Sequence, residues 1–170
     1  MLGDYLRNCT SGVEYRVPEL HHRPTRAIEQ AASACAGSDA ADLTLVGSSL
    51  GGFYATVMAE RLGCRAALLN PAVRPHTHFE KYLGPRENLY TGEKFTLTHE
   101  HVEALRDLDP GPVTRPERYW LFVETGDVVL DYRDAVKLYD GALQTIVRGG
   151  DHTLASFPEH VPEIVEWAKS

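Results

Sequence analysis

Short runs of apolar, β-forming residues alternate along the chain with segments in which apolar residues recur every three or four positions. Runs of the first kind predict strands, and the second spacing predicts helices that each bury one face. We expect strands at 43–46, 65–69, 119–123 and 145–147, and helices over 2–6, 24–36, 50–62, 132–139 and from about 158 onward. Strands that alternate with helices indicate βα units and a mostly parallel sheet, so the sequence predicts an α/β fold.

Two segments, one of them not yet named, carry strand signals of different kinds. Residues 43–46 (LTLV) are mostly apolar β-formers, which predicts a strand buried on both faces. Residues 13–17 (VEYRV) alternate apolar and polar positions and end at Pro18, which predicts a short, half-buried strand.

A long stretch between Leu69 and Tyr119 contains no predicted strand and many proline and glycine residues. Long structureless loops are uncommon in compact domains, so this stretch needs an explanation. We expect one domain over 1–170 in which 71–117 forms a lid or cap over a site, with a helix near 99–107. A plain helical crossover is the alternative interpretation.

Composition excludes several classes of protein. The chain has 170 residues with 17 basic and 24 acidic side chains, a formal net charge of −7, and no cluster of Lys and Arg. This balance argues against binding to nucleic acid or to an anionic membrane. No apolar run approaches the length of a membrane span, and the first residues do not follow the order of a signal peptide. Three widely spaced cysteines suggest reduced thiols in a cytoplasmic protein.

The strongest chemical signal is the segment 47–51 (GSSLG), which lies between a predicted strand and a predicted helix. A serine on such a strand-to-helix turn is held in a strained conformation that exposes its hydroxyl, so Ser49 is the candidate nucleophile. Gly47 and Gly51 are expected because the two backbones approach closely there. The N–H of Leu50 is the candidate oxyanion donor. A glycine-rich turn or a phosphate-binding loop is the alternative.

A serine nucleophile needs a base that is itself oriented by an acid. In chains with this turn the order is serine, acid, histidine. Asp127 follows the predicted strand 119–123, and His152 follows the predicted strand 145–147, so both lie where strands end at the same edge of the sheet. Asp131 is a rival acid, although its position favours a helix start.

The remaining histidines give no metal signal. The pairs His76/His78 and His99/His101 have a spacing that shares a face only on a strand, and no third ligand accompanies them. His21 and His22 are expected to lie in a solvated loop. We therefore expect neither a metal nor a cofactor.

Six segments in order resemble the YqiA-like family of small bacterial esterases over nearly the whole chain: 46–54 (VGSSLGGFY), 70–75 (NPAVRP), 88–92 (NLYTG), 124–127 (ETGD), 130–133 (LDYR) and 149–152 (GGDH). The resemblance implies the α/β-hydrolase fold, a three-layer sandwich, and hydrolysis of carboxylic esters or acyl thioesters of small molecules without a cofactor. Position by position it implies Ser49 as nucleophile, Asp127 as acid and His152 as base.

The chain departs from the family at its start. Similar chains begin earlier, with a strand and a His-Gly-Phe loop that contributes a second oxyanion donor. The resemblance therefore implies an N-terminally truncated version of the fold, with weak or no activity in the chain as written. Two alternatives remain: a non-catalytic binding protein on a hydrolase scaffold, and an acyltransferase or thioesterase with the same nucleophile turn. Oligomeric state and substrate-binding residues are not indicated.

Overall fold

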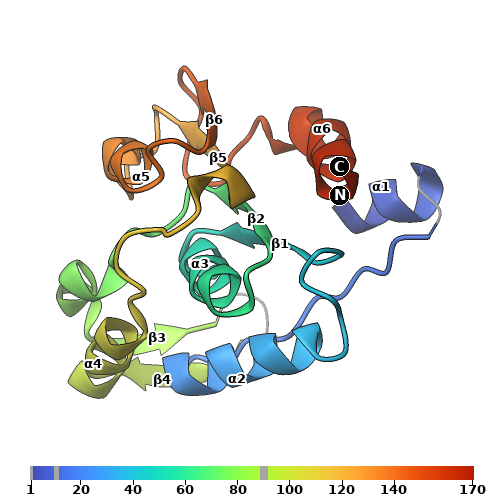
Figure 1. Ribbon diagram of the computed structural model, residues 1–170. Helices are drawn as coiled ribbons and strands as arrows, with labels where there is room; N and C mark the ends of the chain where they lie inside the picture. Colours follow the sequence, from blue (N-terminus) through green and yellow to red (C-terminus); the bar gives the residue numbers. More distant parts are fainter. Residues whose placement is uncertain (1, 10–11, 89–91) are drawn as a thin grey trace.

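The computed structural model describes residues 2–9, 12–88 and 92–170. Its centre is a sheet of four parallel strands in the order β1-β2-β5-β6, which confirms the α/β prediction (Figure 1). The strands are β1 (Thr44–Ser48), β2 (Arg65–Leu69), β5 (Tyr119–Glu124) and β6 (Leu143–Val147).

Helices cover both faces of this sheet. The helices among the described residues are α1 (Leu2–Cys9), α2 (Pro24–Cys35), α3 (Leu50–Leu62), α4 (His99–Leu108), α5 (Tyr132–Leu138) and α6 (Phe157–Lys169). Helices α3 and α5 pack on one face, and α6 packs on the other with α1 against its outer side. Helices α2 and α4 pack on the outer side of α3. The result is a three-layer α/β/α sandwich (Figure 1).

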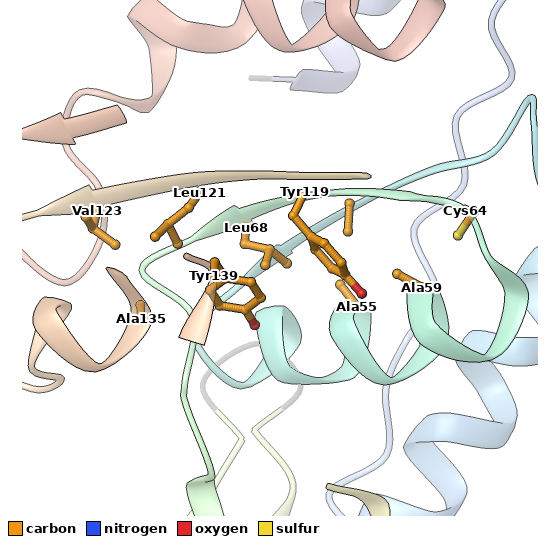
Figure 2. Packing of buried hydrophobic residues seen from close by; sticks show 10 residues of the cluster. Ala55, Ala59, Cys64, Leu68, Tyr119, Leu121, Val123, Ala135 and Tyr139 are labelled. Carbon is orange, nitrogen blue, oxygen red and sulfur yellow. The ribbon is translucent and has the colours of Figure 1, made fainter. Parts of the chain in front are cut away.

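The core follows the two-residue period of the central strands. Leu68 and Leu121 point toward α3 and α5, whereas Ala67 and Phe122 point toward α6. Every residue of β5 is buried, as a central parallel strand requires. Figure 2 shows the α3 side of this core, where Tyr139 and Tyr119 fill the space between the strands and α3.

Strand β1 is less buried than its sequence predicts. Val46 is 37% exposed, and β1 pairs with β2 on one side only, among the residues that the structure describes. The expectation that 43–46 is buried on both faces is therefore wrong. An apolar run indicates that a strand belongs to a buried sheet. It does not show whether both faces of the strand are covered or whether a second strand pairs with its other edge.

The predicted strand at 13–17 is also not present. These residues run without regular secondary structure, and Val13, Tyr15 and Val17 are exposed. Alternation of apolar and polar side chains favours an extended backbone, but a strand also needs a hydrogen-bonding partner. None of the described strands pairs with this segment.

The stretch 71–117 has more structure than the sequence indicated. Its described residues form the 3₁₀ turns η1 (Pro75–Thr77) and η2 (Phe79–Tyr82), a hairpin of β3 (Gly84–Glu87) and β4 (Lys94–Leu97), and α4. A further 3₁₀ turn, η3 (Pro116–Arg118), begins at its end. The helix expected near 99–107 is confirmed as α4, whereas the hairpin was missed because its first strand is short and polar. Residues 89–91 of the family segment 88–92 lie outside the described residues. A lid function for 71–117 stays a prediction.

No helix among the described residues combines the length and the apolar character needed to cross a membrane.

The core predicts which leucines stabilise the fold. Leu68 is fully buried between the sheet and α3, whereas Leu62 at the end of α3 is 40% exposed. We expect Leu68→Ala to lower the free energy of unfolding by about 2–5 kcal/mol, because it leaves a cavity. Leu62→Ala, the matched control, should change it by roughly 0.5 kcal/mol or less. Urea unfolding followed by circular dichroism measures both, and equal losses would contradict this packing.

Candidate active site

Ser49 lies on a sharp turn between β1 and α3. Its backbone has φ 52° and ψ −123°, a conformation that non-glycine residues rarely adopt. The turn is held by neighbouring backbone: the Ser49 N–H donates to the Leu69 carbonyl at 3.0 Å, and the Ala72 N–H donates to the Ser49 carbonyl at 2.9 Å. The strained serine predicted from the segment 47–51 is therefore observed.

The glycines around Ser49 have unequal roles. A Cβ at Gly47 would collide with the backbone of Gly51, so the expected close approach is present there. A Cβ at Gly51 would meet nothing within 4 Å, so the requirement expected for Gly51 is wrong. The tight contact falls instead on Gly52, where a Cβ would lie 2.7 Å from the Cβ of Pro71. The packing of Pro71, which follows β2, could not be read from the motif alone.

The structure brings Ser49, Asp127 and His152 together. His152 lies in the loop between β6 and α6, and its Nε2 is 2.9 Å from Ser49 Oγ. Its Nδ1 is 2.7 Å from Asp127 Oδ2, on the loop that follows β5. The three side chains therefore form a continuous chain of hydrogen bonds at the carboxyl edge of the sheet.

The hydrogen bonds of Asp127 assign the tautomer of His152. The Asp127 side chain is 1% exposed, and its Oδ1 accepts the backbone N–H groups of Val129 (2.8 Å) and Leu130 (2.9 Å). Asp127 acts as an acceptor in both of these bonds, and its Oδ2 accepts a hydrogen from His152 Nδ1. Nε2 keeps its lone pair and faces the Ser49 hydroxyl, as a general base requires.

Asp131, the rival acid, has a different role. It is the N-cap of α5, and its carboxylate accepts the Arg133 backbone N–H and pairs with the exposed Arg133 guanidinium. The hydrogen bonds from Arg133 lower the pKa of Asp131 to about 2. The helix-start interpretation of Asp131 is therefore confirmed.

Leu50 is the first residue of α3. The N–H groups of a first helical turn have no acceptor within the helix and lie at the positive end of its dipole. The Leu50 N–H is one of these groups and directly follows Ser49 in the chain. Its role as an oxyanion donor stays a prediction.

Two polar residues near the site were not singled out from the sequence. Asn70 and Glu124 are 2% and 1% exposed, and both contact the loop that carries His152. Only their positions in the sequence could have indicated them. Glu124 is the last residue of β5 and Asn70 directly follows β2, and the interior residues of both strands are apolar. A polar side chain at the end of a buried strand faces the same edge of the sheet as the triad.

One histidine cluster lies outside this site. Ligand atoms of His21, His22 and Glu93 fall within 4.8 Å of one another. The His22 side chain is only 13% exposed, so the expectation of a solvated position is wrong for His22. His22 Nδ1 lies 3.1 Å from His101 Nε2, and His101 Nδ1 accepts the Thr98 N–H at 3.2 Å. In this pattern His101 Nε2 donates to His22 Nδ1, so the hydrogen of the neutral His22 ring lies on Nε2, the nitrogen that faces Glu93. A nitrogen that binds a metal needs a lone pair instead. The expectation that the chain binds no metal stays a prediction.

Comparison with known proteins places the chain in a family. Residues 1–169 match the model of the Uncharacterised protein family UPF0227, the YqiA family. The chain belongs to this family. The resemblance drawn from the six sequence segments is thereby confirmed, and the match covers every described residue except Ser170.

Solved structures share the fold of this UPF0227 member. A protein of Agrobacterium vitis S4 superposes with a TM-score of 0.64 and 21% identity, covering 85% of this chain and 68% of that one. The esterase domain of a Rhodothermus marinus protein gives 0.57 and 20%, covering 87% and 68%. Alpha/beta hydrolase domain-containing protein 10 from mouse gives 0.64 and 16%, covering 86% and 69%. The α/β-hydrolase fold is thus confirmed.

The two adjacent glycines supply a test of the turn. We expect Gly52→Ala to destabilise the protein and to displace Ser49, because the new Cβ meets Pro71. Gly51→Ala is the matched control, since its Cβ enters open space and alanine favours helices. Thermal unfolding should show a lower Tm for Gly52→Ala only. A Gly51→Ala variant that is the less stable of the two would contradict the described packing.

Proposed function

We propose that this protein is a serine esterase that hydrolyses carboxylic esters through Ser49, His152 and Asp127. The observation that carries the proposal is the chain of hydrogen bonds from Asp127 through His152 to Ser49, with the serine on a strained turn. Each group has the partner that its role requires, which a chance arrangement of polar residues does not supply.

In the first half of the reaction Ser49 Oγ attacks the ester carbonyl. His152 Nε2 accepts the hydroxyl proton as the bond forms, and the Asp127 carboxylate stabilises the resulting imidazolium. The Leu50 N–H donates to the oxyanion of the tetrahedral intermediate. The intermediate collapses when the imidazolium gives its proton to the leaving alcohol, and the acyl group stays on Ser49.

In the second half a water molecule replaces the alcohol. His152 takes a proton from this water, which attacks the acyl-enzyme carbonyl, and a second tetrahedral intermediate forms. The proton then passes to Ser49 Oγ, which leaves as the free hydroxyl and releases the carboxylic acid. The cycle needs no cofactor or metal, and the enzyme returns to its starting state.

The same groups support related reactions. A thioester carbonyl is attacked in the same way, and an alcohol in place of water would make the reaction an acyl transfer. We propose hydrolysis of small-molecule esters or acyl thioesters in the cytoplasm, the compartment that the sequence predicts. A non-catalytic binding protein on this scaffold would leave Ser49 unreactive toward a fluorophosphonate probe, which separates it from an enzyme.

Hydrolysis of a short-chain nitrophenyl ester tests the nucleophile. We expect the wild-type protein to release nitrophenol and Ser49→Ala to abolish the enzyme-dependent rate, because Ser49 Oγ is the oxygen held against His152 Nε2 among the described hydrogen bonds. Circular dichroism checks that the variant is folded. Full activity in folded Ser49→Ala would refute the assignment.

The two aspartates provide a matched comparison of the acid. We expect Asp127→Asn to reduce kcat by about 10⁴-fold, because an amide favours the unproductive tautomer of His152. Asp131→Asn keeps an N-cap side chain on α5 and should leave kcat within about twofold. Steady-state kinetics on the same ester decide between them. The acid would have to be reassigned if Asp131→Asn were the damaging change.

A further inference from the structure

The loop that carries His152 is held by a buried carboxylate. Glu124 Oε2 accepts the backbone N–H groups of Asp151 (2.6 Å) and Ala155 (3.2 Å), and Oε1 accepts that of Ser156 (2.8 Å). These donors lie on both sides of His152. One side chain at the end of β5 therefore fixes both ends of the segment from which the imidazole projects.

A second buried side chain holds the same loop by its carbonyl groups. Asn70 Nδ2 donates to the carbonyl oxygens of Asp151 (2.9 Å) and His152 (3.3 Å). Its Oδ1 accepts the Glu124 N–H at 3.0 Å. Asn70 and Glu124 thus form one connected hydrogen-bond network. The Glu124 carboxylate accepts N–H groups of the loop, and the Asn70 amide donates to carbonyl groups of the same loop.

The backbone on either side of Asn70 also holds Ser49. Leu69 accepts the Ser49 N–H, and Ala72 donates to the Ser49 carbonyl. Asn70 itself has φ 40°, an uncommon conformation for a non-glycine residue, and its N–H donates to the Phe122 carbonyl at 2.9 Å. The short segment after β2 therefore connects the turn of Ser49 with the loop of His152, which lies 103 residues further along the chain.

The loop depends on these partners because its own conformation is unfavourable. Leu154 has φ 56° and is 2% exposed, and it lies between two residues whose N–H groups bind Glu124. Gly150 has φ 69°, and a Cβ there would occupy the space of the Glu124 carboxylate. A strained segment keeps its shape only where its surroundings over-determine it.

The charge of Glu124 is compatible with its burial. Burial alone raises the pKa of a carboxyl, but the hydrogen bonds from Ser156, Asp151 and Ala155 outweigh it and lower the pKa of Glu124 below its usual value. The carboxylate form accepts all of these bonds at once, which a glutamine amide cannot do because its nitrogen only donates.

We propose that Asn70 and Glu124 are positioning residues that hold His152 Nε2 against Ser49 Oγ. This inference rests on the proposed esterase function, since it assigns their effect to the alignment of that triad. Neither side chain contacts Ser49 Oγ or the His152 ring among the described hydrogen bonds, so both act through the backbone. Misplacing a reacting group by about 1 Å can cost roughly 10²-fold in rate.

The test compares Asn70→Ala and Glu124→Gln with Tyr139→Phe. Tyr139 is buried and its hydroxyl bonds Thr56 at 2.7 Å on the α3 side of the core, so Tyr139→Phe removes a buried hydrogen bond away from the loop. Figure 2 shows this tyrosine pointing toward α3. Two site variants are used so that the test stands if one of them does not fold.

Steady-state kinetics on the nitrophenyl ester give the first measurement. We expect each folded site variant to lose about 10–100-fold in kcat with KM changed by less than about threefold, because the imidazole is misplaced while neither changed side chain is one that the proposed mechanism assigns to the ester. Tyr139→Phe should keep kcat within about twofold even if its Tm falls. Site variants that lose stability but keep kcat would overturn the proposal.

Proton NMR gives a measurement that does not depend on turnover. The hydrogen between His152 Nδ1 and Asp127 should give a downfield resonance that Asp127→Asn removes. We expect this resonance to broaden or vanish in the site variants and to persist in Tyr139→Phe. Its persistence in both folded site variants would overturn the inference. Absence of ester hydrolysis by the wild-type protein would instead refute the proposed function, and the resonance would still test the positioning of His152.

Discussion

The arrangement of this site depends on the strained backbone of Ser49. A residue with φ 52° between β1 and α3 turns the chain sharply enough to lift the serine hydroxyl clear of the sheet. The strain persists because Leu69 and Ala72 hold the Ser49 backbone and because Gly47 and Gly52 leave room for it. The position of the serine hydroxyl, the start of α3 and the roles that we propose for Ser49 and Leu50 all depend on that one turn.

The parallel sheet supplies the other two groups. In a parallel sheet the carboxyl ends of all strands meet at one edge, so the loops after β1, β5 and β6 converge although they are far apart in sequence. Ser49, Asp127 and His152 each lie on one of these loops. The segment after β2 lies between them, which places Asn70 where its amide reaches the His152 loop.

Local patterns predicted the parts of this fold that depend on local forces. Alternating strands and helices gave the layers, and the glycine-serine segment located the turn, because short-range sterics determine both. Which strands meet in space determines the hairpin of β3 and β4 and the exposed edge of β1. It also determines that segment 13–17 pairs with none of the described strands. Likewise Gly52 is constrained by Pro71, and Asn70 and Glu124 by a loop that follows later in the chain. No pattern of spacing within a segment contains that information.

Mass spectrometry of the protein during ester hydrolysis tests the central claim most directly. The claim is that the Ser49 hydroxyl, deprotonated by His152, carries the acyl group between the two halves of the reaction. After rapid mixing with a nitrophenyl ester and acid quenching, peptide mapping should find one acyl group on Ser49 in the wild-type protein and none in His152→Ala. Hydrolysis without any acyl-serine, or an acyl group on a different residue, would contradict the account.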